Sequence, residues 1–421
     1  MRLPVLSIVL LFIFSILVDL YISFDVKQMW RKSGVVVYGI TSTLCYALLI
    51  VAISLPRRDV STGIATVMWL LFTYLTIYGG KLIYVLFSLL GRALRAGIRP
   101  RMKYYPSRLI GALAGCVFIC LMWVGAGYTR HHIELTYHDF YSEKLPKAFD
   151  GYKIVQLSDL HVGTWGEDQS FLKNIVDSVN ALHPDLIVFT GDIVNRESHE
   201  LAPFVEVLSG LKAKDGVYSI LGNHDYGDYV DWETPEDKVK NLQRLKDYQK
   251  EMGWKMLNNE SAFIHAGSDS ILLIGVENWG EPPFPQYGDL HKALPAKEST
   301  PHNESDSISS TSGRHQNDSG FKLLLSHNPE HWNREVSHDT NIDLTLSGHT
   351  HAMQALVRIG DWKWSPAKYR YEQWGGRYDR ENKNGEPTSV YVNIGSGEVG
   401  MPARILSAYP EVTVITLKHQ D

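Results

Sequence analysis

Long apolar runs with very few charges dominate the first 130 residues of the chain. Each run is close to, or longer than, the ~20 residues that a helix needs to cross a bilayer. A signal peptide could explain the first run alone, but it lacks a convincing small-residue cleavage site and further runs follow it. We therefore predict a transmembrane anchor over residues 1–130, with about four spans at 3–24, 35–55, 65–90 and 109–128.

Charged residues in these runs are few. Asp19 lies in the first and Lys81 in the third. We expect them to lie near an interface, to snorkel or to face neighbouring helices, rather than to mark a transport path. The cysteines Cys45, Cys116 and Cys120 all fall in spans, so cysteine usage does not indicate a redox compartment.

Basic residues in the short loops predict the orientation, because loops rich in Lys and Arg stay in the cytoplasm. With four spans, nine basic residues lie on one side and four on the other. The larger group is Lys27, Arg31, Lys32, Arg92, Arg95, Arg99, Arg101, Lys103 and Arg108, and the smaller is Arg2, Arg57, Arg58 and Arg130. This bias places both the N-terminus and residues 151–421 outside the cytoplasm. A re-entrant third run would invert the result.

The pattern changes after residue 130. Residues 131–150 are polar and contain proline, which favours a linker, and residues 151–421 are enough for a full two-layer core. Short apolar runs at 153–158 and 186–190 flank a segment with apolar residues at helical spacing, so we predict strand, helix, strand and a parallel sheet. Residues 298–320 have almost no apolar content and predict a disordered loop.

Metal-binding side chains follow five strand-like runs. They are Asp159 and His161; Asp192; Asn223, His224 and Asp225; His327; and His349 and His351. Any one of them alone is an ordinary loop residue. Five such endings in one chain, in oxygen and nitrogen ligands without cysteine, indicate a site for divalent metals of the Mn, Fe or Zn kind.

The order of these motifs, D-x-H, G-D, G-N-H-D, H and G-H-x-H, resembles that of the calcineurin-like metallophosphoesterase superfamily, in particular its bacterial membrane-anchored members. The resemblance covers about 151–417 and implies an α/β fold, a four-layer α/β/β/α sandwich. It implies two divalent metal ions of undetermined identity. One would bind Asp159, His161, Asp192 and His351, and the other Asp192, Asn223, His327 and His349. The ions would neutralise the phosphoryl oxygens and supply hydroxide near neutral pH.

The resemblance further implies that His224 protonates the leaving alkoxide or stabilises the phosphoryl group, and that Asp225 helps to orient its imidazole. Two positions depart from the family pattern. Asn195 stands where an acid often supports the catalytic histidine, so we expect a less stabilised imidazolium. Ala352 and Met353 stand where a glycine pair is frequent, which casts doubt on a close backbone approach there.

We therefore predict an integral membrane hydrolase of a phosphate ester, either a monoester or a diester. Its location favours a lipid-linked substrate, and the bacterial cytoplasmic membrane is the expected site. The alternative is a non-catalytic scaffold or sensor with the same fold; a transporter gated by the phosphatase has only Asp19 and Lys81 in its favour. The net charge of −5 does not favour nucleic acid, and no protein partner is inferred. The aromatic-rich insertion at 362–378 could cap the strand ends, meet the membrane interface or close a sheet.

Overall fold

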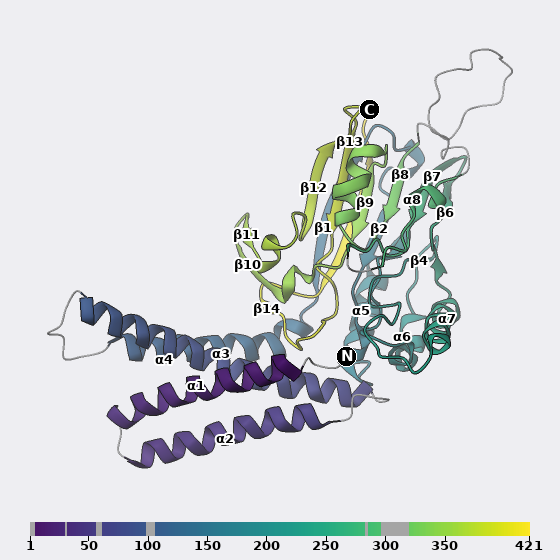
Figure 1. Cartoon of the computed structure of the whole chain (residues 1–421). Helices are drawn as coiled ribbons and strands as arrows, with labels where there is room; N and C mark the ends of the chain where they lie inside the picture. The colour runs from purple at the N-terminus through teal and green to yellow at the C-terminus, as the bar shows by residue number, and fades with distance from the viewer. Residues whose placement is uncertain (1–4, 30–31, 56–60, 98–105, 283–284, 296–319) are drawn as a thin grey trace. The chain divides into compact units, whose positions relative to one another are not determined.

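The computed structural model describes residues 5–29, 32–55, 61–97, 106–282, 285–295 and 320–421 (Figure 1). These residues form two compact units. The first comprises Met1–Thr129 with Gly400–Leu406, and the second comprises Arg130–Val399 with Ser407–Asp421. We call them the helical unit and the sandwich unit. The predicted disordered loop at 298–320 lies outside the described residues, apart from its last glycine.

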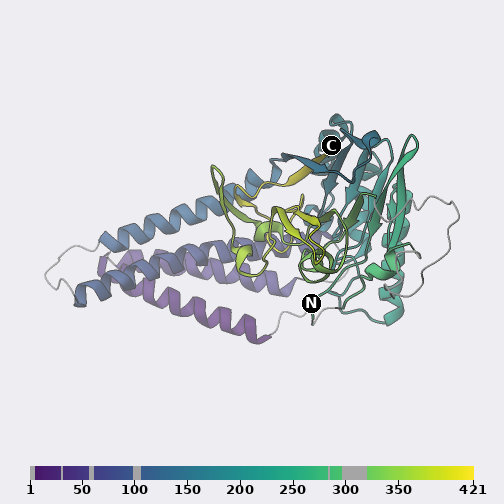
Figure 2. The same cartoon turned by 90° about the horizontal axis from the view of Figure 1, so that it is seen from above.

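Long helices make up the helical unit (Figure 2). They are α1 (Val5–Met29), α2 (Lys32–Ser54), α3 (Ser61–Gly97) and α4 (Pro106–Gly127). All four are long and apolar enough to cross a membrane. Small residues bring α3 and α4 together, since a Cβ on Gly115 would lie 2.6 Å from the carbonyl oxygen of Gly80.

One group of polar side chains in the helical unit meets across the helices. Lys81 Nζ lies 2.8 Å from Asp19 Oδ1, and the Asp19 carboxylate also accepts hydrogen bonds from Tyr46 (2.6 Å) and Tyr78 (2.7 Å). Of the placements that the sequence allows for Asp19 and Lys81, the structure shows the one facing neighbouring helices. Such pairing lowers the cost of charge between apolar helices.

The sandwich unit contains two six-stranded sheets. The first has the order β1 (Glu134–Ser142), β15 (Glu411–His419), β2 (Lys153–Leu157), β3 (Leu186–Phe189), β4 (Val217–Ser219), β5 (Lys255–Met256). The second has the order β12 (Gly376–Glu381), β13 (Pro387–Val392), β9 (Leu344–Ser347), β8 (Lys322–Leu325), β7 (Asp269–Gly275), β6 (Glu260–Ala266). The pairs β2–β3, β3–β4 and β8–β9 are parallel, as the strand, helix, strand pattern predicts.

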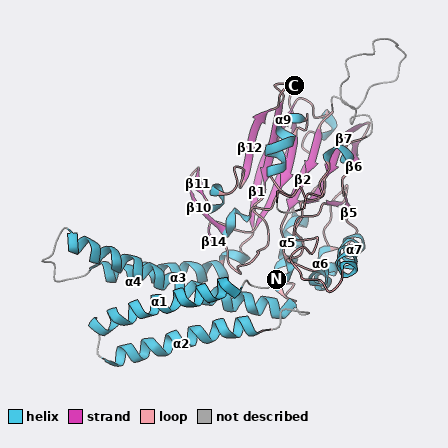
Figure 3. Ribbon diagram, viewed as in Figure 1, coloured by secondary structure: helices cyan, strands magenta, loops and turns pink. Residues whose placement is uncertain are grey.

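Figure 3 shows the strands and helices of the sandwich unit. Side chains that alternate along the strands divide its core into layers. Val155 and Leu157 of β2 pack on one face with the helices α5 (Ser170–Ala181), α6 (Val205–Leu208) and α7 (Pro235–Glu251). Ile154 points the other way, into a cluster shared with Leu323 of the second sheet. The far face of that sheet packs on α8 (Leu290–Ala293) and on the segment Trp332–Val336. This is the four-layer α/β/β/α arrangement.

Residues 131–150 differ from the expected linker, because they contain β1. This strand pairs in parallel with β15 along its whole length, from Glu134 beside Glu411 to Ser142 beside His419. Only Phe140 is fully buried in β1, so its composition is that of an exposed edge strand rather than of a core strand. Polar composition alone therefore did not separate an edge strand from a linker.

Candidate metal centre

The predicted metal-binding side chains lie beyond the carboxyl ends of five strands, β2, β3, β4, β8 and β9, where open α/β sheets place their ligands. The backbone turns sharply there. Asp159, Asp192 and His349 have φ of 53°, 60° and 74°, and His161 and His351 are also left-handed. This conformation is uncommon for residues other than glycine, and its concentration here is typical of a functional site.

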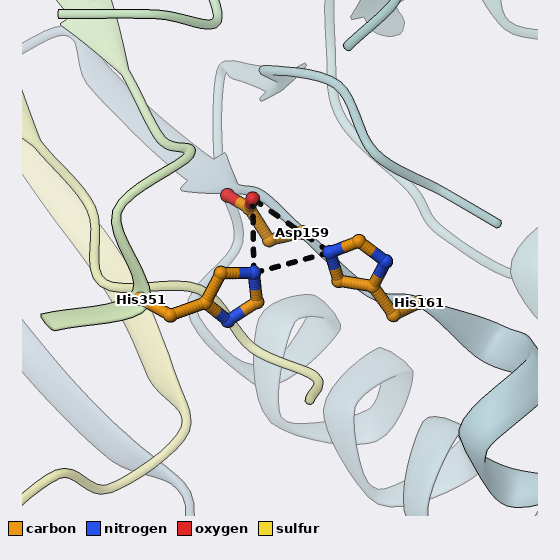
Figure 4. Close-up of side chains that lie close together, drawn as sticks. All are labelled: Asp159, His161 and His351. Atoms are coloured by element: carbon orange, nitrogen blue, oxygen red, sulfur yellow. Dashed lines mark hydrogen bonds and ion pairs between the residues drawn. The ribbon is translucent and has the colours of Figure 1, made fainter. Parts of the chain in front are cut away.

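Asp159, His161 and His351 form the first cluster (Figure 4). Nε2 of His351 lies 3.2 Å from Asp159 Oδ1 and 3.1 Å from Nε2 of His161. Nδ1 of His161 lies 3.1 Å from the carbonyl oxygen of Val194, which can only accept. Nδ1 therefore carries the proton, and the lone pair of Nε2 faces the cluster, as a metal ligand requires.

Asp192, His327 and His349 form the second cluster. Nε2 of His327 lies 3.2 Å from Asp192 Oδ2, 3.2 Å from Nδ1 of His349 and 3.1 Å from the side-chain oxygen of Asn223. Asp192 Oδ2 also lies 3.6 Å from Nε2 of His161 in the first cluster. The Asp192 carboxylate thus lies between the two groups of donors.

Most charges of the site suit a cation. His327 is the exception, because burial lowers its pKa but Asp192 outweighs burial and raises it to about 9, so this imidazole must lose a proton to bind an ion. Burial and the neighbouring His327 lower the pKa of His349 to about 3, and burial together with His224 holds the pKa of His161 well below its usual value, so both are neutral donors. Burial opposes ionisation of Asp192, but His327 and His224 outweigh it and keep the pKa of this carboxyl well below its ordinary value. Two sets of three buried or half-buried donors, each within 4.8 Å of one another, fit divalent ions that accept imidazole and carboxylate ligands.

His224 lies beside the clusters and is held on two sides. Its Nδ1 donates to the carbonyl oxygen of Asn195 (2.6 Å), and its ring stacks on Tyr229 with centroids 4.4 Å apart. Its backbone N–H donates to Asp192 Oδ1 (2.8 Å). Because Nδ1 is committed to the carbonyl, Nε2 is the nitrogen left for a substrate.

Asp225 differs from the expectation that it orients the imidazole. Its carboxylate accepts from the backbone N–H groups of Asp192 (2.9 Å), Ile193 (2.9 Å) and Gly222 (2.8 Å). With the Val194 N–H (3.3 Å), four backbone donors use its oxygens, so it fixes the turn that carries Asp192. Proximity in sequence to His224 was a poor guide, because adjacent side chains in a turn point in different directions.

The Ala352–Met353 pair stands where the family pattern often has two glycines. Both residues adopt the left-handed backbone, with φ of 47°, without glycine. Conformations of this kind cost energy in residues with a Cβ, so the surrounding structure must hold them. Residues 352 and 353 therefore adopt a backbone conformation that glycine adopts easily, although neither is glycine.

Tyr371 is a residue of the site that the sequence did not single out. Its hydroxyl lies 3.2 Å from Nε2 of His349, so one residue of the aromatic insertion contacts a candidate metal ligand. Trp374 of the insertion is buried, whereas Trp362 and Tyr369 are exposed by 57% and 77%. The aromatic residues of the insertion therefore lie in different surroundings: one contacts the site, one is buried and two are exposed. Their spacing in the sequence does not show which residue lies where.

Comparisons with known proteins agree with this geometry. The family model described as calcineurin-like phosphoesterase matches residues 152–353. An uncharacterized metallophosphoesterase of Bacillus subtilis, YkuE, is 30% identical over 302 residues, which are 70% of this chain and 90% of that protein. The chain belongs to the calcineurin-like phosphoesterase family. This phosphoesterase is thus a metal-dependent hydrolase that acts on phosphoric esters.

Two further relatives bear on the membrane. A zebrafish protein described as a transmembrane protein with metallophosphoesterase domain is 31% identical over 66% of this chain, and the match spans 55% of that protein. The UDP-2,3-diacylglucosamine pyrophosphatase LpxG of Chlamydia muridarum is 41% identical over 118 residues, which are 26% of this chain and 34% of LpxG. Together with the four apolar helices, the transmembrane relative supports a membrane protein.

Proposed function

We propose that this phosphoesterase cleaves its substrate at a two-metal centre. One ion would bind Asp159, His161, Asp192 and His351, and the other Asp192, Asn223, His327 and His349. The observation that supports this most is the position of Asp192 Oδ2, 3.2 Å from one imidazole of the second cluster and 3.6 Å from one of the first. A carboxylate between two donor groups is suited to bridge two ions.

The chain's own groups then supply orientation and a proton. Bound divalent ions neutralise the phosphoryl oxygens and lower the pKa of coordinated water, which is the chemistry that two-metal sites provide. Asn195 and Tyr229 hold the His224 ring, and its Nε2 delivers a proton to the departing alkoxide oxygen. Such proton transfer contributes typically 10²–10⁴ in rate. Asp225 keeps the Asp192 turn in place through its backbone hydrogen bonds.

We propose a lipid-linked phosphate as the substrate class. Two observations support it: the apolar helices of this chain, and a partial relative whose name gives a pyrophosphatase of an acylated sugar nucleotide. The test compares turnover of a soluble phosphodiester with that of a bilayer-embedded phosphate ester by full-length protein. We expect the embedded substrate to be preferred, and equal turnover of both would remove this support.

We also propose a role for each part of the chain. Residues 1–130 would anchor the protein, and residues 151–421 would form the hydrolase domain together with β1, the edge strand that lies within 131–150. The excess of Lys and Arg in two loops supports an extracytoplasmic location of that domain, with the bacterial cytoplasmic membrane as the membrane concerned.

Metal analysis combined with a panel of phosphomonoesters, phosphodiesters and lipid phosphates tests the proposal. We expect Asp192→Ala to lose metal and activity together, because the carboxylate that would serve both ions is gone. We expect His224→Ala to keep its metal and lose most of its turnover, because that side chain lies beside the clusters without belonging to either. A metal-bound wild-type protein that cleaves none of these esters would favour a scaffold or sensor instead.

A further inference from the structure

Glu200 is a buried acid that lies outside both candidate metal clusters. It lies in the short 3₁₀ segment Ser198–Phe204 and is 1% exposed. Its Oε2 accepts from the backbone N–H groups of Asn195 (2.6 Å) and Arg196 (3.3 Å). A buried carboxyl is costly, so its position requires these two donors.

One peptide group joins Glu200 to His224. The peptide between Asn195 and Arg196 donates its N–H to Glu200 Oε2 and accepts the Nδ1–H of His224 at its carbonyl oxygen. A peptide held at both ends cannot rotate, and hydrogen bonds in series strengthen one another in a low-dielectric interior. The plane of this peptide therefore fixes the direction in which the imidazole points.

The side chains around this peptide leave its hydrogen bonds to Glu200 and His224 undisturbed. The Asn195 amide nitrogen donates to Thr164 Oγ1 (2.9 Å), so this side chain bonds a hydroxyl, and it is the Asn195 backbone carbonyl that holds the imidazole. Gly163 leaves room for the carboxyl, since a Cβ there would lie 2.5 Å from Glu200 Oε2. An acid is thus coupled to His224 through a peptide, where the family pattern often has an acid at residue 195.

We infer that Glu200 is a positioning residue for His224, acting through the Asn195–Arg196 peptide. The inference rests on the proposed role of His224 as proton donor to the leaving group. Losing the acceptor at residue 200 should then harm esters that need a protonated leaving group and spare those that do not. A residue that only stabilises the fold would affect both kinds of ester alike.

The test uses full-length Glu200→Met, which keeps the length of the side chain and removes the acceptor, and Glu200→Gln, which keeps an acceptor oxygen. An alkyl phosphate ester has a poor leaving group and a p-nitrophenyl ester a good one. For Glu200→Met we expect kcat on the alkyl ester to fall about tenfold or more and on the p-nitrophenyl ester about twofold, with KM and bound metal unchanged. Glu200→Gln and the exposed control Glu206→Gln should stay within about twofold of wild type.

Two further variants test whether Glu200 acts through His224. In a His224→Ala background, Glu200→Met should cause no additional loss, because both changes remove one function. If Glu200→Met does not fold, Gly163→Ala replaces it. The added methyl group would displace the same carboxyl, and it would also press on Asn195 Oδ1, which would lie 2.8 Å away, so the peptide that holds His224 is disturbed and the same difference between esters is expected.

The inference is overturned if Glu200→Met or Gly163→Ala lowers kcat equally on both esters, or if the loss persists in the His224→Ala background. Failure of the proposed function looks different. In that case His224→Ala itself would show no greater loss on the alkyl ester than on the p-nitrophenyl ester, whatever happens at residue 200.

Discussion

The hydroxyl of Tyr371 lies 3.2 Å from Nε2 of His349, whose other nitrogen faces the second cluster. A partner on Nε2 keeps the proton there and leaves the Nδ1 lone pair for a metal. We predict that Tyr371→Phe weakens metal binding about tenfold, within the range typical for removal of such a partner. Competition with a chelator measures this directly. Tyr369→Phe, which alters an exposed tyrosine two residues away, should bind metal as wild type does, and an unchanged affinity in Tyr371→Phe would contradict the assignment.

The buried carboxyl of Asp343 makes the stability of the protein depend on pH. Burial raises the pKa of Asp343 from 3.8 to about 6, although the Lys322 N–H and Lys144 partly oppose this. Between those two values the folded state binds more protons than the unfolded state, so this group lowers stability as pH rises from about 4 to about 6 and has no further effect above.

Asp343→Asn removes that titration and keeps an oxygen for the Lys322 N–H, which lies 2.8 Å from the carboxyl. The variant should therefore gain stability relative to wild type across this window, by an amount on the order of 3 kcal/mol at neutral pH. Thermal unfolding of full-length protein in detergent at pH 4.5 and 7 measures it. A difference between variant and wild type that is the same at both pH values would contradict the shift.

The candidate metal ligands could be predicted from the sequence because each follows a short apolar run, so strand ends and ligands coincide. Glu200 and Tyr371 could not. Neither follows a strand, and each acquires its role from a contact across the fold, to a peptide at residues 195–196 and to His349. Interactions of this kind depend on tertiary packing, which no local pattern encodes.

At the scale of elements, the sharp turns after β2 and β9 bring the clusters together, and glycine permits the contact. A Cβ on Gly348 would lie 2.0 Å from Ser158 Oγ and 2.3 Å from Asp159 Oδ2. We predict that Gly348→Ala displaces Asp159 and loses most bound metal and activity, as metal analysis of the purified variant would show. Gly320→Ala is the control, because a Cβ there meets no atom of the described residues within 4 Å. Full metal occupancy in Gly348→Ala would contradict the close packing of these turns.

The pattern of apolar residues predicted the buried elements and missed an edge strand. Apolar runs and helical spacing predicted β2, β3 and α5, which are buried on both faces or on one stripe. They did not predict β1, whose side chains other than Phe140 are half-buried or exposed and whose pairing partner, β15, begins 277 positions later at Glu411. An edge strand is defined by its partner, so its own residues carry little of the signal.

For the molecule as a whole, loop charge predicts the side of the membrane. We expect a fusion of alkaline phosphatase after Asp421 to be active, because the enzyme folds in an oxidising compartment, and a fusion after Arg95 to be inactive. A fluorescent reporter that folds in the cytoplasm should give the reverse pattern. Activity in the second position and inactivity in the first would place the hydrolase domain in the cytoplasm.

The two-metal centre is the claim on which the proposed chemistry depends most. Anomalous X-ray scattering from crystals of full-length protein, recorded at the Mn, Fe and Zn absorption edges, tests it most directly. We predict two peaks, one among Asp159, His161 and His351 and the other among Asp192, His327 and His349, with the Asp192 carboxylate between them. A single peak, or none at these six side chains in a preparation that hydrolyses phosphate esters, would contradict it.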